Sequence, residues 1–337
     1  MGTIDLSKSS IYSLQNVYLP PETDVLILDD NQLESIDLEL PQCIEKISLE
    51  NNNFIAIPQI ANLCLTTLSL GWNCIEELNV KNGCIFHNLH DLNLQQNNIT
   101  ELPHAFAQSF PSLQILSLRS NKLCQLPESF CDLTSLEDLD VSYNLLVDLP
   151  NSLSNLSSLE SFNVCANKIV TLPESFSSLN NLEMMNISQN SLETLPLECS
   201  STSTLTALYI HNNFLVDLPD WIFQLNLDVF EYNGNNFKED TNELLESFRI
   251  SQQEMSSSND WNQCADDWDA EIAENRIYSG EDDPRSVLPP RQLRSPISMS
   301  PFYQLPAVLH RASIIPRVKL MRRPDLAVCV GQFDNAD

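Results

Sequence analysis

One pattern of apolar and polar positions recurs eleven times between residues 4 and 237. Two apolar residues stand two apart, an asparagine follows three positions later, and another apolar residue follows two after that. Ser9 takes the asparagine position in the first copy, and the other ten copies have Asn31, Asn52, Asn73, Asn97, Asn121, Asn144, Asn167, Asn190, Asn213 and Asn235. Because one such unit cannot bury its own apolar face, a regular period of about 20 to 29 residues predicts a solenoid of stacked coils.

Each copy predicts a short β-strand that ends in a turn. In residues 136–146 the apolar residues Leu139 and Val141 alternate into the interior, so Asp140 and Tyr143 are expected to point outward. The asparagine amide is expected to bond backbone groups that the turn leaves open, in its own coil and in the next. Its replacement by alanine should destabilise the fold by about 1–3 kcal/mol.

The strand is followed by a Leu-Pro pair in six copies, with proline at positions 103, 127, 150, 173, 196 and 219. Proline cannot donate to a sheet, so it should end the strand and open a short helical turn on the convex side, as at 127–130 and 173–176. Residues 238–250 predict a helical cap for the last coil, with Asp240 or Thr241 as the capping residue and with one apolar face. That face comprises Leu244, Leu245 and Phe248.

The run LPESFCDLTSLEDLDVSYNLLVDLPNSLSNLSSLESFNV, residues 126–164, resembles the leucine-rich repeats of cytosolic scaffolds that act around Ras signalling and cell polarity. That class includes the Ras–Raf pathway scaffold, erbin and scribble, and the plant intracellular Ras-group proteins. The resemblance is strong over residues 90–237 and weak over residues 4–90. It implies an α/β solenoid, a horseshoe of about eleven leucine-rich repeats with a parallel concave sheet and short helical or irregular convex segments. It also implies a non-catalytic binding arc for a protein partner such as a small GTPase, a phosphatase or a kinase.

The outward strand positions along the predicted concave arc are the candidate binding residues. Trp, Tyr and Arg on a rigid strand are the residue types that dominate interface energies. The candidates are therefore Trp72, Arg119, Asp140, Tyr143, Tyr209 and His211.

The net charge bears on the kind of partner, and the placement of the cysteines bears on the cellular compartment. The net charge is −29, and residues 1–250 carry 33 acidic and 8 basic residues, so the solenoid should repel nucleic acid. No run approaches the roughly 20 apolar residues of a transmembrane helix, and the first residues show no signal peptide. The ten cysteines are scattered rather than clustered at the repeat ends. We therefore expect a monomer in the cytoplasm or the nucleus.

Catalytic motifs are not apparent in the sequence. Six glycines form no phosphate-binding loop, and the five histidines do not pair with a plausible nucleophile. Cys84, His87, His90 and Asp91 lie close in sequence, but we interpret them as a longer loop rather than a closed zinc site. The sequence predicts a protein that is not an enzyme and needs no cofactor or metal.

The chain divides into repeats over 1–237, a cap over 238–250 and a tail over 251–337 that we expect to be mostly disordered. The tail is acidic over 254–283 and basic and proline-rich over 284–323. Its candidate phosphorylation sites are Ser295, Ser300 and Ser313.

Two other interpretations remain open at this stage. The chain could be the regulatory N-terminal part of a larger enzyme, such as a phosphatase, because residues 326–334 resemble the start of a further domain. No paired-Asp metal motif follows residue 250, so phosphatase activity itself is not expected. The chain could also be an extracellular recognition module, which the scattered cysteines disfavour.

Overall fold

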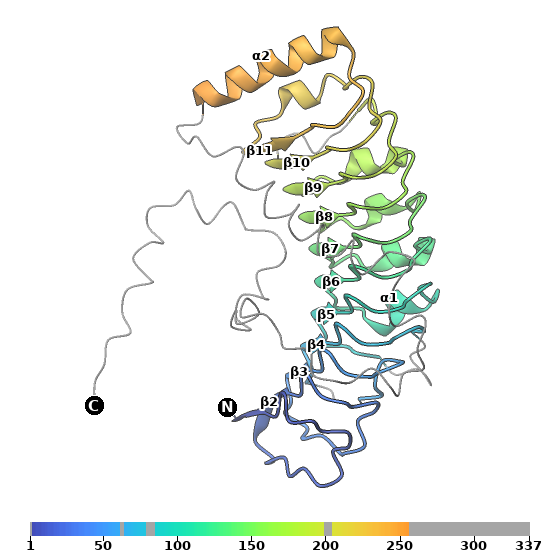
Figure 1. Cartoon of the computed structure of the whole chain (residues 1–337), viewed down its shortest axis with the longest axis vertical. Coiled ribbons are helices and arrows are strands. Elements are labelled where there is room, and N and C mark those ends of the chain that lie inside the picture. Colours follow the sequence, from blue (N-terminus) through green and yellow to red (C-terminus); the bar gives the residue numbers. More distant parts are fainter. Residues whose placement is uncertain (1, 61–63, 79–84, 199–203, 256–337) are drawn as a thin grey trace, which may run out of the picture. The chain divides into compact units, whose positions relative to one another are not determined.

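The computed structural model describes residues 2–60, 64–78, 85–198 and 204–255, with side chains described up to residue 250. The repeats lie in one compact unit that extends to Gln252. Its described residues form a single parallel sheet of eleven strands in chain order, which confirms the predicted solenoid (Figure 1). The strands are β1 (Gly2–Asp5), β2 (Thr23–Ile27), β3 (Lys46–Ser48), β4 (Thr67–Ser69), β5 (Asp91–Asn93), β6 (Ile115–Ser117), β7 (Asp138–Asp140), β8 (Ser161–Asn163), β9 (Met184–Asn186), β10 (Ala207–Tyr209) and β11 (Val229–Glu231).

The register of the sheet stacks like positions of the repeat on one another. Leu116, Leu139, Phe162 and Met185 are the middle residues of β6 to β9, and each pairs with the next. All four are at most 1% exposed, because the middle residue of each strand points into the solenoid. The residues on either side of it therefore point to the opposite, concave face of the sheet.

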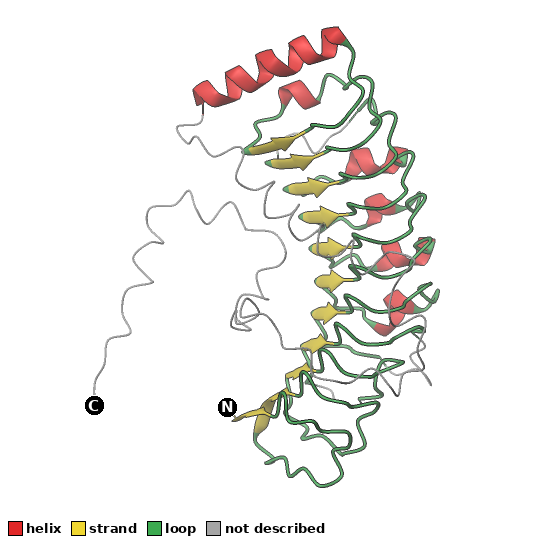
Figure 2. Cartoon of the chain, in the orientation of Figure 1, coloured by secondary structure: helices red, strands yellow, loops and turns green. Residues whose placement is uncertain are grey.

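Coil length decides what the convex side looks like. The coils between Asn31 and Asn73 are the shortest, and their described residues return through loops, whereas most later coils are longer and have room for helical turns (Figure 2). These turns are α1 (Phe106–Ser109) and the 3₁₀ helices η2 (Glu128–Asp132), η3 (Leu153–Asn155), η4 (Glu174–Ser178) and η6 (Ile222–Gln224). Pro127 and Pro173 directly precede η2 and η4 in an extended conformation, as expected of residues that end a strand segment.

Helix α2 (Glu239–Met255) follows the last coil and continues beyond the expected end of the cap at 250. Phe248 packs edge-on against Phe223 and Phe230, with ring centroids 5.8 and 5.9 Å away. The helix begins before Asp240, so Asp240 and Thr241 lie in its first turn rather than at its cap.

The apolar face of α2 is also narrower than expected. Leu245 and Phe248 are buried, but Leu244 is 55% exposed. No helix among the described residues combines the length and apolar character that crossing a lipid bilayer requires.

Candidate binding surface

The asparagine ladder fixes the backbone that carries the concave face. In the coil of β5, the Asn97 side chain accepts a hydrogen bond from the backbone N–H of Ile75, in the preceding coil, at 2.9 Å. Its amide donates to the carbonyl of Leu70 in that coil at 2.9 Å. It also donates to the carbonyls of Leu94 and Gln95 in its own coil, at 3.0 and 3.1 Å. The other asparagines of the ladder make the same kind of contacts, so each ties its own coil to the preceding one.

The residue before each asparagine turns the chain away from the sheet in the left-handed region. Trp72 and Tyr143 occupy this position, with φ of 58° and 54°. Arg119 and His211 were expected on strands but follow the ends of β6 and β10. Trp72 and Tyr143 were also expected on strands, but β4 ends at Ser69 and β7 at Asp140, so the placement is wrong for all four. Because these strands are so short, the two rings stand at the rim where the strands end. Trp72 is 43% exposed.

A second polar row runs across the strand ends, four positions before the asparagine. In five coils the side chain at this position accepts a hydrogen bond from the backbone N–H of the residue two positions later, at 2.8 to 3.1 Å. The five residues are Asp5, Asn93, Asp140, Asn163 and Asn186. One side-chain oxygen of each residue is thus hydrogen-bonded to the backbone of the turn, and this bond holds the side chain in a single orientation.

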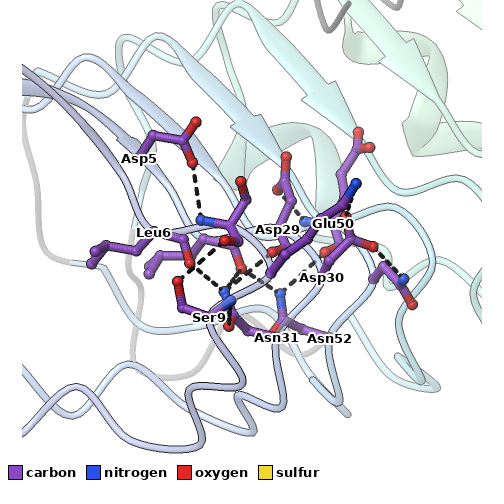
Figure 3. Close-up of polar contacts among 12 residues, drawn as sticks. Asp5, Leu6, Ser9, Asp29, Asp30, Asn31, Glu50 and Asn52 are labelled. Carbon is purple, nitrogen blue, oxygen red and sulfur yellow. Dashed lines mark hydrogen bonds and ion pairs between the residues drawn. The ribbon is translucent and has the colours of Figure 1, made fainter. Parts of the chain in front are cut away.

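The first coils form an acidic end of this face (Figure 3). Asp29 accepts hydrogen bonds from the Ser48 hydroxyl at 2.6 Å and from the Glu50 backbone N–H at 2.8 Å. Burial raises the pKa of Asp29 to about 6, although both of these hydrogen bonds act to lower it. Lys8 lies 3.9 Å from Asp30 and is the basic partner in this group. The charge of Asp29 therefore changes as the pH passes through about 6.

Arg119 and Tyr143 are brought together in the middle of the arc. The guanidinium carbon of Arg119 lies 4.4 Å from the centre of the Tyr143 ring, within the range of a cation–π contact. Arg119 also approaches the Ser142 hydroxyl at 3.5 Å, and Asp140 accepts a hydrogen bond from the Ser142 N–H. Because neighbouring strands are only about 4.8 Å apart, such long side chains reach the adjacent coil.

Exposure of the six candidates differs from the expectation that all face open solvent. Arg119 is 4% exposed and Asp140 is 8% exposed, so neither projects into open solvent. Tyr209 and His211 are partly exposed and lie near β11, three coils from Tyr143. The His211 Nδ1 atom is 3.7 Å from a carboxylate oxygen of Glu231. The candidates thus form a central group of Arg119, Asp140 and Tyr143, a C-terminal pair of Tyr209 and His211, and Trp72 apart from both, rather than one cluster.

The described residues contain no group of three or more His, Cys, Asp or Glu side chains arranged to hold a metal ion. Cys84 and the candidate phosphorylation sites Ser295, Ser300 and Ser313 lie outside the described residues.

Comparison with known proteins is in accord with this geometry. The family model described as "Leucine rich repeat" matches residues 87–146. The fold is a leucine-rich-repeat solenoid. A search of curated protein sequences finds no match.

Among solved structures, the leucine-rich effector protein YopM from Yersinia pestis is 28% identical, with a TM-score of 0.52. That match covers 66% of this chain and 60% of YopM. The octameric complex of latrophilin 3, Unc5D and the leucine-rich-repeat protein FLRT2 contains a chain that is 22% identical, with a TM-score of 0.61, covering 71% of this chain and 76% of that one. An internalin from Listeria monocytogenes is 19% identical, with a TM-score of 0.57. That match covers 72% of this chain and 77% of the internalin. At these identities the last two show the fold alone.

Proposed function

We propose that this protein is a non-catalytic interaction module that holds a protein partner on the concave face of its sheet. The observation that carries the proposal is the exposed Trp72 and the partly exposed Tyr143, whose ring the buried Arg119 contacts, on a backbone fixed by the asparagine ladder. Tryptophan, tyrosine and arginine supply most of the binding energy at protein interfaces. A surface held in one conformation loses little entropy on binding. Leucine-rich-repeat solenoids use their extended concave surfaces in this way.

The acidic end of the arc indicates the kind of partner. Asp5, Asp29, Asp30 and Glu50 lie on successive coils, and residues 1–250 carry 33 acidic against 8 basic residues. A basic surface on the partner would be steered to this end and oriented there. Together with the sequence resemblance, this favours a partner from a signalling pathway, such as a small GTPase, a phosphatase or a kinase.

We further propose that the chain acts as a monomeric signalling scaffold in the cytoplasm or nucleus. Cys43, Cys74, Cys124 and Cys131 carry free thiols, which suits a reducing compartment. The tail over 251–337 would contribute short docking peptides and phosphorylation sites at Ser295, Ser300 and Ser313.

Proximity labelling in cells tests the proposal. The full chain is compared with a variant that carries Trp72→Ala, Arg119→Ala, Tyr143→Ala and Tyr209→Ala. Tyr12→Ala with Tyr18→Ala is the matched control, because these tyrosines are 81% and 79% exposed but lie in the loop between β1 and β2. Circular dichroism checks that all variants fold.

We expect the wild type and the control to label the same small set of proteins. The concave-face variant should no longer label them. An unchanged set with all three chains would show that the concave face is not the binding surface.

A further inference from the structure

A second surface lies outside the concave face, on the segments that leave the sheet after each asparagine. Positions one and three after the asparagine can point outward there, and in the coils of β7, β8 and β10 apolar residues are exposed at them. We call this row of exposed apolar side chains the flank stripe. It comprises Leu145 (38% exposed), Val147 (52%), Val170 (44%), Phe214 (54%) and Val216 (39%). In the coil of β9, between Val170 and Val216, the exposed Glu193 takes the same position.

Hydrogen bonds hold these segments side by side. The N–H of Leu145 donates to the Leu123 carbonyl in the preceding coil at 2.8 Å, and the N–H of Lys168 donates to the Leu146 carbonyl at 2.8 Å. Equivalent positions are therefore one strand spacing apart, about 4.8 Å, and Val147 is stacked next to Val170. The stripe forms a rigid row that crosses the coils.

The spacing of the row fits one turn of a helix. An α-helix rises about 5.4 Å per turn, so residues at i, i+4, i+7 and i+11 can follow side chains that repeat at about 4.8 Å. Apolar residues at i, i+4 and i+11 would then meet Val147, Val170 and Val216, and a polar residue at i+7 would meet Glu193. The four coils from β7 to β10 span about 14 Å, and the twelve residues from i to i+11 span about 16 Å, so a helix of about three turns covers the stripe. Recognition of an amphipathic helix by its apolar face is a general mode of protein binding.

Charge defines the two borders of the stripe. Lys122 and Lys168 are exposed at the position one after the asparagine, in the same row as Leu145 and Phe214, on the side of the stripe nearest the sheet. Lys168 lies within the stripe, in the coil of β8, and Lys122 lies one coil before the stripe, in the coil of β6. They are two of only eight basic residues in residues 1–250. Asp148 and Asp217, at the position four after the asparagine, are exposed on the opposite border, where Asp217 is paired with Lys238 and accepts a hydrogen bond from the Thr241 hydroxyl. A helix with acidic residues on one side of its apolar face and basic residues on the other would meet both borders in one orientation.

We propose that the flank stripe binds an amphipathic helix of a partner protein, whose acidic side faces Lys122 and Lys168. This site is separate from the concave face and does not depend on the function proposed for it. The protein could then hold two partners at once, one on the sheet and one beside it.

The test uses the full chain and two synthetic peptides, each about four helical turns long and held helical by a side-chain staple. Both have leucine at positions i, i+4 and i+11 and glutamine at i+7. One carries glutamate along one side of the leucine face and the other carries lysine there. Binding is followed by fluorescence anisotropy of the labelled peptides. The glutamate peptide should bind more tightly than the lysine peptide.

Three variants locate the site. Val147→Glu with Val170→Glu should weaken the glutamate peptide at least about tenfold, since it removes two apolar contacts and adds repulsion. Ile55→Glu is the matched control: Ile55 is 70% exposed at the same repeat position in the coil of β3, and this variant should bind like the wild type. Lys122→Glu with Lys168→Glu should reverse the preference, so that the lysine peptide binds better.

Three results would overturn the proposal. The first is that neither peptide binds at millimolar concentration. The second is that binding is unaffected by the Val147 and Val170 substitutions. The third comes from sedimentation: if the wild type dimerises and Val147→Glu with Val170→Glu abolishes the dimer, a second copy of the chain covers the stripe instead.

Discussion

Replacing Asn97 by alanine removes four hydrogen bonds, but the groups left behind are affected unequally. The carbonyl of Leu70 still accepts from the Asn73 amide at 3.0 Å, and that of Leu94 from the Asn121 amide at 2.9 Å. The carbonyl of Gln95 keeps its bond from the Trp72 N–H at 2.9 Å. Because each carbonyl has a second donor, these three losses are partly compensated.

The backbone N–H of Ile75 is the group that loses its acceptor. Ile75 is fully buried, and within the described residues its N–H bonds only to the Asn97 side chain, at 2.9 Å. An unsatisfied buried donor costs about 1–3 kcal/mol, and the weakened carbonyl bonds add to it. We therefore expect Asn97→Ala to lower the free energy of unfolding by about 2–3 kcal/mol.

Asn98→Ala is the control, because Asn98 is the adjacent residue and its side chain is only partly buried. Urea unfolding followed by circular dichroism measures the stability of both variants, and amide hydrogen exchange of Ile75 measures the local effect. We expect a loss of less than about 0.5 kcal/mol for Asn98→Ala and faster exchange at Ile75 only in Asn97→Ala. If both variants lost the same stability and Ile75 remained protected, the ladder would not be satisfying this group.

Two further predictions concern the ends of the solenoid. The pKa of Asp29 is raised from 3.8 to about 6, so its contribution to stability is full below 3.8 and is lost as pH rises through about 6. Asp29→Asn keeps the acceptor oxygen, and its stability relative to wild type should therefore increase between pH 4.5 and pH 7.5; a constant difference in urea unfolding would contradict the raised pKa. At the other end, Phe248→Ala removes the ring that packs on Phe223 and Phe230 and should cost about 3 kcal/mol. Leu244→Ala in the same helix, at a side chain 55% exposed, should cost far less, and equal losses by thermal unfolding would refute the packing of α2.

The repeat was the part of the fold that sequence could predict. Period-two alternation and the regular asparagine fix the strands, because each copy must bury the same positions and bond the same backbone groups. The convex side also followed from Leu-Pro pairs such as Leu126-Pro127, since proline cannot continue a strand. Helix α2 was foreseen, but the exposure of Leu244 was not. The coil beneath a capping helix decides which face of the helix is buried. The sequence of the helix alone does not contain that information.

The binding surface was predicted less well. Trp72 and Tyr143 were expected to point outward from the strands. Each stands two positions after a buried residue, Leu70 or Val141, so alternation alone would turn it inward. Left-handed turns instead carry both rings to the rim, and a repeat of period two cannot indicate a positive φ at a non-glycine residue. The contact of Arg119 with Tyr143 joins residues one coil apart and depends on the stacking register. The flank stripe was detectable, because Val147, Val170 and Val216 recur at the same repeat position. The strand pattern does not indicate it, because these positions follow the ends of the strands.

Hydrogen–deuterium exchange of the full chain, alone and with a partner captured by proximity labelling, tests the central claim most directly. If the partner binds the concave face, exchange should slow in the strand ends and turns around residues 67–72, 117–120 and 138–143. The loop between β1 and β2, residues 10–22, should exchange at the same rate with and without the partner. Slower exchange in that loop, with no change at the strand ends, would contradict the proposed function.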